Sequence, residues 1–276
     1  MTDNRESTDR YDRQIALFGA EGQAKLKEAL VAVVGLGGLG SHVCQQLAYL
    51  GVRQFTVVDD DDVEDTNLNR LIGASPDDIG VPKTAVAERV ITQIQPDAIV
   101  QIVGQKLPHT EIDSALDSAH YVLGCLDSDY PRMLLNDLAS ALHIPYIDSA
   151  SGTGLETYGG RIVVAGSSRG CLHCLNLLDQ TEIRRAQMGP AELEVEAQIY
   201  GVPVGELRRS GPSVVSVNGV VSSLAVTEFM VMATGLREPK KHLVYRGDSG
   251  TVNSSIDGPD PDCFYCTAWL GADRSG

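Results

Sequence analysis

The chain has 276 residues, of which 43% are hydrophobic and 21% are charged. This composition can bury enough apolar surface to offset the entropy of ordering, so it excludes a disordered tail and predicts one or two globular domains. The 37 acidic side chains outnumber the 22 basic ones and give a net charge of −15. Such a surface repels phosphate backbones, which argues against nucleic acid as the main partner.

The sequence also argues against a membrane partner. Residues 1–10 are polar and charged and contain no apolar run of signal-peptide length, which predicts a cytoplasmic protein. One stretch, 214–236, is long enough to cross a bilayer, but it contains Asn218 and Glu228. We therefore expect a buried helix there.

The first half of the chain alternates predicted helices and strands. In order, the pattern predicts a helix at 21–30, a strand at 31–34, a glycine turn, a helix at 41–50, a strand at 55–58, a helix after Pro82, strands near 98–103 and 121–125, a helix near 131–142 and a strand at 146–148. This alternation indicates an α/β fold of the doubly wound, Rossmann-like type, with a mostly parallel sheet covered by helices on both faces.

The pattern changes after about residue 150. Glycine-rich strands are predicted at 157–165, followed by a polar crossover at 176–212, the long apolar helix and short strands at 242–246 and 251–255. We interpret the crossover as a mobile, solvated charged loop with one or two helical turns. The short strands predict a C-terminal antiparallel extension of the sheet.

A glycine turn follows the first predicted strand. In the motif Gly35-x-Gly37-x-x-Gly40, which also includes Gly38, the first glycine permits a tight turn, the second lets the backbone approach phosphate and the last allows close packing of helix on strand. Asp59 ends the next strand, where its carboxylate can bind a ribose hydroxyl. These features predict a nucleotide site, which could hold either a dinucleotide or ATP.

Two cations and a carboxylate favour ATP. Arg70 and Lys83 lie on the side of the sheet where phosphates would bind, and cations that neutralise a triphosphate fit ATP better than NAD. Asp127 comes just after the strand at 121–125, where a carboxylate can hold Mg²⁺ against phosphate oxygens. The alternative role for Asp127 is to cap the following helix, which Ser128 or Asp129 could do equally well.

Four cysteines form two pairs, Cys171 with Cys174 and Cys263 with Cys266. Two such pairs far apart in sequence satisfy a tetrahedral zinc ion, and a closed four-sulfur shell predicts a structural zinc knuckle rather than a catalytic site. The alternative is four incidental free thiols. We interpret His173 as a solvent-facing residue of the knuckle.

Six separated motifs together resemble the ThiF/MoeB/HesA branch of the ubiquitin-activating enzymes. They are Arg10-Tyr11-Asp12-Arg13-Gln14-Ile15, the stretch from Val34 to Ser41, Asp59-x-Asp61-x-Val63, Asn67-Leu68-x-Arg70, Lys83 and Asp127. The resemblance covers roughly residues 10–270, nearly the whole chain. A dehydrogenase would share only the glycine turn and Asp59.

The resemblance implies a role for each matched residue. Asp59 would bind the ATP ribose within a motif that includes Asp61. Asn67, Arg70 and Lys83 would hold the phosphates, and Asp127 would coordinate Mg²⁺. Arg13 would be an arginine finger that reaches the ATP of the other subunit in a homodimer. The catalytic residues would then be Arg13, Arg70, Lys83 and Asp127, and the cofactors ATP, Mg²⁺ and a structural Zn²⁺.

The implied substrate is the C-terminal carboxylate of a small β-grasp protein, ubiquitin-like or a sulfur carrier, that ends in Gly-Gly. Adenylation suits this substrate because it gives a poor acyl donor a good leaving group. Three alternatives remain open: adenylation of another carboxylate, on a peptide or a modified tRNA base; an NAD-dependent dehydrogenase; and a non-enzymatic half of a heterodimer.

Members of this family that form a thioester carry the nucleophilic cysteine in the crossover, yet residues 176–212 contain no cysteine. The resemblance therefore implies an enzyme that stops at adenylation. We interpret Cys44 and Cys125 as small buried residues, although Cys125 lies two residues from Asp127. We expect 1–150 to be the nucleotide-binding region and 151–276 the zinc, crossover and carrier-binding region of the same continuous domain.

Overall fold

The computed structural model describes residues 10–153, 158–166, 169–200, 203, 213–254, 260 and 263–265. The strands are β1 (Leu30–Val34), β2 (Gln54–Val58), β3 (Ile99–Val103), β4 (Tyr121–Gly124), β5 (Tyr146–Thr153), β6 (Tyr158–Ala165), β7 (His242–Arg246) and β8 (Thr251–Ser254). The helices are α1 (Asp12–Glu28), α2 (Gly38–Leu50), α3 (Lys83–Ile94), α4 (Thr110–Leu116), α5 (Asp129–Ala141), α6 (Gln180–Gln187), α7 (Pro190–Tyr200) and α9 (Val215–Thr234), with short 3₁₀ turns η1 (Asp65–Asn67) and η2 (Pro76–Asp78).

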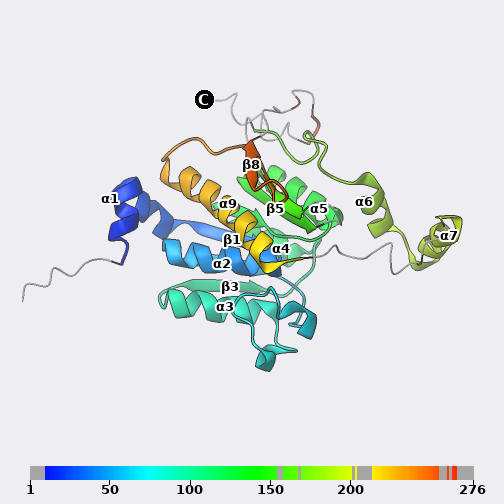
Figure 1. Cartoon of the computed structure of the whole chain (residues 1–276), viewed down its shortest axis with the longest axis horizontal. Helices are drawn as coiled ribbons and strands as arrows, with labels where there is room; N and C mark the ends of the chain where they lie inside the picture. Colours follow the sequence, from blue (N-terminus) through cyan, green and yellow to red (C-terminus); the bar gives the residue numbers. More distant parts are fainter. Residues whose placement is uncertain are drawn as a thin grey trace, which may run out of the picture.

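All the strands belong to one sheet, in the order β3-β2-β1-β4-β5-β6-β7-β8 (Figure 1). The pairs from β3 through β5 are parallel, whereas β5–β6, β6–β7 and β7–β8 are antiparallel. The order reverses at β1, because the chain moves from β1 outward to β2 and β3 and then returns to β4 on the other side. This confirms the predicted doubly wound sheet and its C-terminal antiparallel extension.

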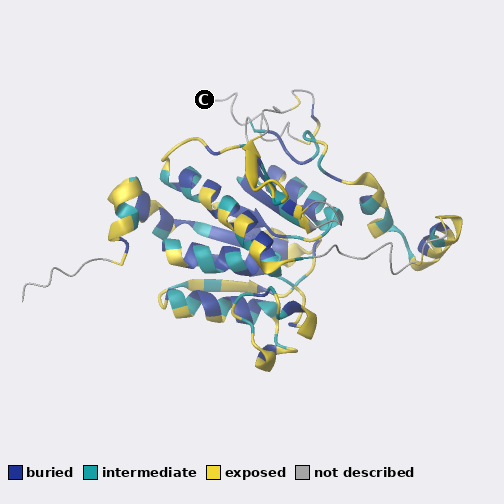
Figure 2. Ribbon diagram, in the orientation of Figure 1, coloured by how far each residue is buried: buried dark blue, intermediate teal, exposed yellow. Residues whose placement is uncertain are grey.

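Helices cover both faces of the sheet and create two cores (Figure 2). Strand β1 is apolar at every position because both of its faces are covered. Val31 and Val33 belong to the core that contains α1, α2, α3 and α9, whereas Ala32 and Val34 belong to the core that contains α4 and α5. Successive side chains of a strand point to opposite faces, so a strand covered on both faces needs an unbroken apolar run.

The long apolar helix α9 packs against α1, α2, β5 and β6. Phe229 is fully buried and meets the Tyr121 ring edge-on, with 5.1 Å between ring centroids, and the Ser222 hydroxyl donates to the Leu39 carbonyl oxygen at 3.0 Å. Within the described part of the chain, α9 is the one helix whose length and composition would allow a membrane span, and 50% of its apolar window is buried. The structure thus places it as a core helix of this fold.

The crossover is more regular than the sequence indicated. It contains the eight-residue helix α6 and the eleven-residue helix α7, so our prediction of a loop with one or two turns was wrong for the described part, 176–200. Asp179 caps α6 by accepting from Thr181 N at 2.8 Å, and Arg184 and Arg185 of α6 each pair with Glu196 of α7 at 3.0 Å. The cap and this shared carboxylate stabilise two short helices that propensity alone would not.

The segment between β2 and α3 carries four predicted site residues, and an ion pair between Arg89 and Asp78 helps to hold it to α3. Arg89 binds Asp78 through its two terminal guanidinium nitrogens, Nη1 at 2.7 Å and Nη2 at 2.8 Å, and Nη2 also donates to the Gly73 carbonyl oxygen at 3.0 Å. Ser75 adds a backbone donor to Asp78 at 2.7 Å. A two-pronged contact of this kind fixes both the position and the orientation of the segment.

The Asp78 contact predicts a pH-dependent contribution to stability. Hydrogen bonds from Arg89, and then from Ser75, hold the pKa of Asp78 well below its usual range. Because the folded-state pKa is depressed, the stabilisation is complete above the unfolded pKa of about 3.9 and is lost as pH falls towards the folded value. Asp78→Asn should therefore lower the free energy of unfolding at pH 7, and the deficit should shrink between pH 5 and pH 3 in urea titrations.

The exposed neighbour Asp77 provides the matched control. Asp77→Asn should change the free energy of unfolding little at any of these pH values, since surface substitutions are usually within about 0.5 kcal/mol of neutral. A deficit in Asp78→Asn that stays constant from pH 7 to pH 3 would contradict the proposed linkage.

Candidate active site

A cavity of about 330 Å³ opens at the carboxyl ends of β1, β2 and β4, where the strand order reverses. Ligands bind at this point in doubly wound sheets. The cavity is lined by Val34, Gly35, Gly37, Gly38, Leu39, Val58, Asp59, Asp60, Asp61, Asn67, Arg70, Leu71, Lys83, Gln105, Lys106, Leu107, Cys125, Leu126, Asp127, Ser128, Pro131, Arg132, Ser151, Ser213 and Asn218.

The glycine turn forms the floor of this cavity. Gly35 has φ of +88°, which side-chain-bearing residues rarely adopt, and a Cβ on Gly40 would overlap the Gly35 carbonyl oxygen. Gly37 faces the cavity, and a Cβ there would meet no atom of the described chain within 4 Å. The start of α2 therefore presents bare backbone to a ligand, as a phosphate requires.

Asp59 links the glycine turn to the segment that follows β2. Its carboxylate accepts from Leu36 N at 2.6 Å and from Asp61 N at 2.9 Å, and Lys83 Nζ lies 3.8 Å away. Burial raises the pKa of Asp59, and Lys83 together with the two amides opposes that effect. Lys83 also binds Asp61 at 2.6 Å, so the ammonium predicted to hold phosphate is here paired with two carboxylates.

Asn67 and Arg70 line the cavity from the η1 turn. Asn67 is buried and its side-chain oxygen accepts from Glu64 N at 3.2 Å, which fixes the start of the turn. Arg70 donates to the Thr66 carbonyl oxygen at 2.6 Å, and its Cδ would lie 3.3 Å from a Cβ on Gly38. The guanidinium group is thus held beside the glycine turn.

Asp127 lies in the loop between β4 and α5 and lines the cavity with an exposed side chain. Ser128 occupies the N-cap position of α5, so the structure does not use Asp127 as the cap. No residue that the structure describes makes a hydrogen bond or ion pair with the Asp127 carboxylate. A free carboxylate beside a phosphate site has the chemistry of a magnesium ligand, because Mg²⁺ binds through one or two carboxylates and the phosphate oxygens.

A buried ion pair fixes the loop that carries Asp127. Arg132, which is 4% exposed, donates to Asp148 Oδ2 at 3.0 Å and to the Leu126 carbonyl oxygen. Tyr146 donates to the other oxygen of the Asp148 carboxylate at 2.8 Å. Removing one partner of such a pair leaves a buried charge and costs about 3–5 kcal/mol, so the loop position is strongly determined.

The crossover is tied to the same loop. Asp129 N donates to Glu182 Oε1 at 2.6 Å, and Asp179 N donates to Asp129 Oδ2 at 2.7 Å. Burial raises the pKa of Glu182, and the nearby Asp129 and Asp179 carboxylates act in the same direction. The start of α6 is therefore anchored beside Asp127.

Two of the residues predicted for the nucleotide site, Gly40 and Arg13, lie apart from the cavity lining. Gly40 packs behind the turn, and Arg13 is an exposed residue of α1. Sequence reasoning also missed lining residues, notably Lys106, Arg132, Ser151, Ser213 and Asn218. Lys106 and Ser151 lie near the carboxyl ends of predicted strands, so the rule that found Asp59 and Asp127 could have found them.

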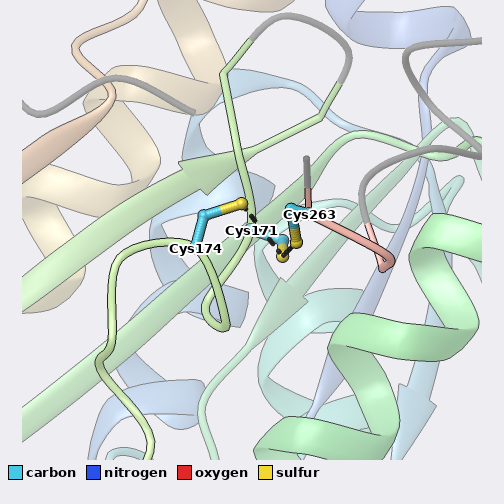
Figure 3. A group of neighbouring side chains, drawn as sticks. All are labelled: Cys171, Cys174 and Cys263. Atoms are coloured by element: carbon cyan, nitrogen blue, oxygen red, sulfur yellow. Dashed lines mark hydrogen bonds between the residues drawn. The ribbon is translucent and has the colours of Figure 1, made fainter. Parts of the chain in front are cut away.

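Three of the four paired cysteines come together (Figure 3). Cys171 Sγ lies 3.8 Å from Cys174 Sγ and 3.9 Å from Cys263 Sγ, and tetrahedral zinc with bonds of about 2.3 Å needs sulfur separations of about 3.8 Å. The donor set therefore fits a structural zinc ion. Cys266, the expected fourth ligand, lies outside the described residues.

Helix α5 holds the cysteine cluster through three successive contacts. Asn136 accepts from Leu172 N at 3.1 Å, His173 shares a 2.8 Å hydrogen bond with Asp137, and Ser140 donates to the Tyr265 carbonyl oxygen at 2.7 Å. His173 also stacks on the Tyr265 ring, with 3.6 Å between centroids. Our expectation of a solvent-facing His173 was wrong, because α5 and Tyr265 cover the ring.

The other two cysteines are buried, as expected. Burial raises the pKa of Cys44 to about 12. Burial also raises the pKa of the Cys125 thiol far above its usual range, and the nearby Cys44 and Asp148 act in the same direction. A cysteine nucleophile needs to be in its ionised, thiolate form, and neither of these thiols is ionised at neutral pH.

The fold and the cavity define a nucleotide-binding α/β protein of the doubly wound class. Residues 11–263 match the ThiF family, and the chain belongs to that family. Membership confirms the predicted enzyme class, an adenylyltransferase of the ThiF/MoeB type.

Three known proteins illustrate the relationship. The sulfur carrier protein ThiS adenylyltransferase of Escherichia coli is 35% identical over 217 residues, covering 72% of this chain and 85% of that protein. The SAMP-activating enzyme E1 of Haloferax volcanii is 34% identical over 169 residues, covering 60% of this chain and 61% of that protein. The crystal structure of E. coli MccB with ATP has the same fold, with a TM-score of 0.74, 23% identity, and coverage of 95% of this chain and 75% of that one.

Replacing one cysteine tests whether the cysteine cluster binds zinc. Cys171→Ser should lower the zinc content from about one ion per chain to near zero and lower the melting temperature, because metal binding is coupled to folding. Cys44→Ala is the matched control, since Cys44 is buried in the opposite core and should cost stability without loss of zinc. Elemental analysis that finds no zinc in the purified wild-type protein would contradict the assignment.

Proposed function

We propose that this chain catalyses ATP-dependent adenylation of the C-terminal carboxylate of a small β-grasp protein, ubiquitin-like or a sulfur carrier, that ends in Gly-Gly. The observation that carries the proposal is one cavity that unites the glycine turn with Asp59, Arg70, Lys83 and Asp127. The substrate class is supported by the named activities of the relatives, one acting on a sulfur carrier and another on SAMP.

The residues suit each part of an ATP molecule. Asp59 would bind the ribose within the Asp59-x-Asp61 motif, while Gly35, Gly37, Gly38 and Gly40 shape the turn that receives the phosphates. Asn67, Arg70 and Lys83 would hold the phosphate oxygens. Asp127 would hold Mg²⁺, which when bound neutralises part of the phosphate charge.

In the reaction, an oxygen of the substrate carboxylate forms a bond to the α-phosphorus. The bond from that phosphorus to the oxygen bridging to the β-phosphate breaks, and its electron pair leaves with pyrophosphate. Arg70 and Lys83 would offset the charge that gathers on the phosphates, and the backbone amides at the start of α2 would do the same.

We propose further that the enzyme keeps the adenylate for attack by an external nucleophile and forms no thioester of its own. The crossover has no cysteine in its sequence, and the buried Cys125 thiol has a strongly raised pKa. A reaction with ATP, Mg²⁺ and the carrier protein should therefore give no thiol-sensitive adduct on a non-reducing gel. An adduct that disappears in Cys125→Ser would place the thioester at that residue and overturn this part of the proposal.

We also propose that Arg13 completes the site of a second copy in a homodimer. Arg13 is exposed on α1 and does not line the cavity of its own chain, so it can act on a nucleotide only across an interface. In this proposal residues 1–150 bind the nucleotide, residues 151–276 bind zinc and the carrier, and the protein works in the cytoplasm.

A peptide carboxylate is the second candidate substrate, because the fold matches MccB, whose structures include the peptide MccA. The remaining alternatives lose support. Adenylation of a modified tRNA base is disfavoured because the net charge of −15 repels nucleic acid. Membership of the ThiF family argues against an NAD-dependent dehydrogenase.

The Asp127→Ala variant tests the reaction. With a purified carrier protein ending in Gly-Gly, ATP–pyrophosphate exchange should fall by about 100-fold or more, because a group that stabilises transition-state charge is removed. The melting temperature should barely change, since the Asp127 side chain is exposed. Unchanged exchange would contradict the role of Asp127, and binding of NAD but not ATP by the wild type would contradict the function itself.

The same variant tests the dimer. Arg13→Ala and Asp127→Ala should each be inactive alone, but a verified mixed dimer should recover up to one working site of two, which combines an intact Arg13 with an intact Asp127. A monomer by light scattering, or a mixed dimer without activity, would contradict the proposal.

A further inference from the structure

The cavity has a polar end that the nucleotide residues do not explain. Asn218, on α9 and only 1% exposed, meets Ser151 of β5 and Ser213 there, and all three line the cavity. The Asn218 side-chain oxygen accepts from Ser151 Oγ at 2.7 Å, and its Nδ2 donates to Ser213 Oγ at 3.0 Å. Both hydroxyls can donate or accept, and the Ser213 hydroxyl also lies 3.4 Å from the Asn218 oxygen. In this arrangement the amide oxygen faces Ser151 and Nδ2 faces Ser213.

One proton of the Asn218 amide remains free. Nδ2 carries two N–H groups, one of which Ser213 accepts, and none of the described residues accepts the other. A Cβ on Gly38 would overlap Nδ2, so the free donor lies against the start of α2. Arg70 approaches the same glycine, with its Cδ 3.3 Å from that Cβ position. A buried donor without an acceptor costs about 1–3 kcal/mol, so a ligand that accepts this hydrogen bond gains that free energy.

The electrostatics at this end favour an anion. Ser213 and Asn218 flank the first turn of the 20-residue helix α9, and Gly37 and Gly38 begin α2. The positive ends of two helix dipoles therefore converge on the place where the free N–H lies. No carboxylate of the described chain makes a hydrogen bond to Asn218, Ser151 or Ser213, so none competes for that position.

Strand β5 leads to the same point. The β4–β5 ladder ends at the pair of Gly124 with Asp148, but β5 continues beside β6 as far as Thr153. The 149–153 part of β5 therefore projects past β4 along the cavity, with Ser151 in its middle. An extended chain can lie along such a strand edge and bring its terminus to the cavity.

The order of strands separates this end from the nucleoside end. Asp59 follows β2 and Ser151 belongs to β5, with β1 and β4 between them. Three strand spacings of about 4.8 Å place the two ends about 14 Å apart. The polar end thus lies away from the nucleoside end and beside the start of α2, where the proposed function places the phosphates.

We propose that Asn218, oriented by Ser151 and Ser213, binds the C-terminal carboxylate of an extended peptide tail and holds it against the α-phosphate. This inference rests on the proposed function and adds to it the residue that recognises the acceptor. Asn218 donates to the carboxylate oxygen that does not attack, which becomes the carbonyl oxygen of the acyl-adenylate.

The test uses two ligands that do not require the natural carrier protein. One is 5′-O-(glycylglycylsulfamoyl)adenosine, a stable analogue of the acyl-adenylate, and the other is 5′-O-sulfamoyladenosine, which lacks the acyl part. The wild type should bind the acylated ligand about tenfold tighter or more, as the gain of a buried hydrogen bond implies. In Asn218→Asp, which replaces the donor by an acceptor of the same shape, the ratio of dissociation constants should fall to near one while the affinity for 5′-O-sulfamoyladenosine stays unchanged.

Two further variants keep the test decisive. Ser151→Ala removes one contact that orients the amide and should lower the ratio about threefold, which also provides a readout if Asn218→Asp does not fold. Ser222→Ala, a buried residue of α9 that contacts α2 rather than the cavity, should leave the ratio unchanged.

The outcomes separate this inference from the proposed function. A wild type that binds both ligands equally, or an Asn218→Asp variant that keeps the tenfold preference, would overturn the role of Asn218 and leave nucleotide binding intact. Failure of the wild type to bind 5′-O-sulfamoyladenosine at all would instead overturn the proposed function, and with it the inference.

Discussion

The buried ion pair between Arg132 and Asp148 organises both functional regions of this protein. It joins α5 to β5, and through the Leu126 carbonyl oxygen it fixes the loop that presents Asp127. The later turns of the same helix hold the cysteine cluster through Asn136 and Ser140. Because α5 is one rigid element, a zinc ion at the cysteines would brace the helix whose other end supports the nucleotide site.

The charge distribution separates the cavity from the rest of the surface. The chain as a whole carries a net charge of −15, whereas the cavity lining balances four basic side chains against four aspartates: Arg70, Lys83, Lys106 and Arg132 against Asp59, Asp60, Asp61 and Asp127. Cations within a cleft on an acidic protein concentrate the field where an anionic ligand binds and leave the outer surface repulsive to polyanions. Lys83 is held between the largely buried Asp59 and the exposed Asp61, so its ammonium group is already desolvated in part before a phosphate arrives.

Sequence reasoning succeeded where a local pattern determines the structure. The apolar run of β1, the glycine turn after it and Asp59 at the end of β2 follow from periodicity and turn chemistry, and the parallel sheet then brings strand ends together. It failed where the cause is a contact between distant residues. The sequence alone gives no reason to single out Arg132, because its buried partner Asp148 lies sixteen positions away and only the fold brings the two together. The crossover helices α6 and α7 depend on Glu196, which two arginines of α6 share, and α4 (Thr110–Leu116) is too short for periodicity to reveal. Asn218 gave the clearest missed signal, because an amide in a long apolar helix needs a buried partner.

The parallel sheet also determines the order in which the candidate binding groups lie across the cavity. Each strand adds a step of about 4.8 Å across the cavity, and its carboxyl end contributes one kind of group: Asp59 after β2, bare glycine backbone after β1, Asp127 after β4 and Ser151 on β5. In the proposed function, the strand order β2-β1-β4-β5 would therefore place nucleoside, phosphate, cation and acceptor in that order across the cavity. In the proposed function, a carboxylate held at the β5 end would face the α-phosphate opposite the leaving pyrophosphate only if the β- and γ-phosphates turn towards Lys83 of α3, which lies beside Asp59 and Asp61 on the β2 side of the cavity. Arg70 and the Asn218 amide both lie beside Gly38, so in this proposal Arg70 would offset the charge that develops at the α-phosphate while Asn218 holds the attacking carboxylate next to it.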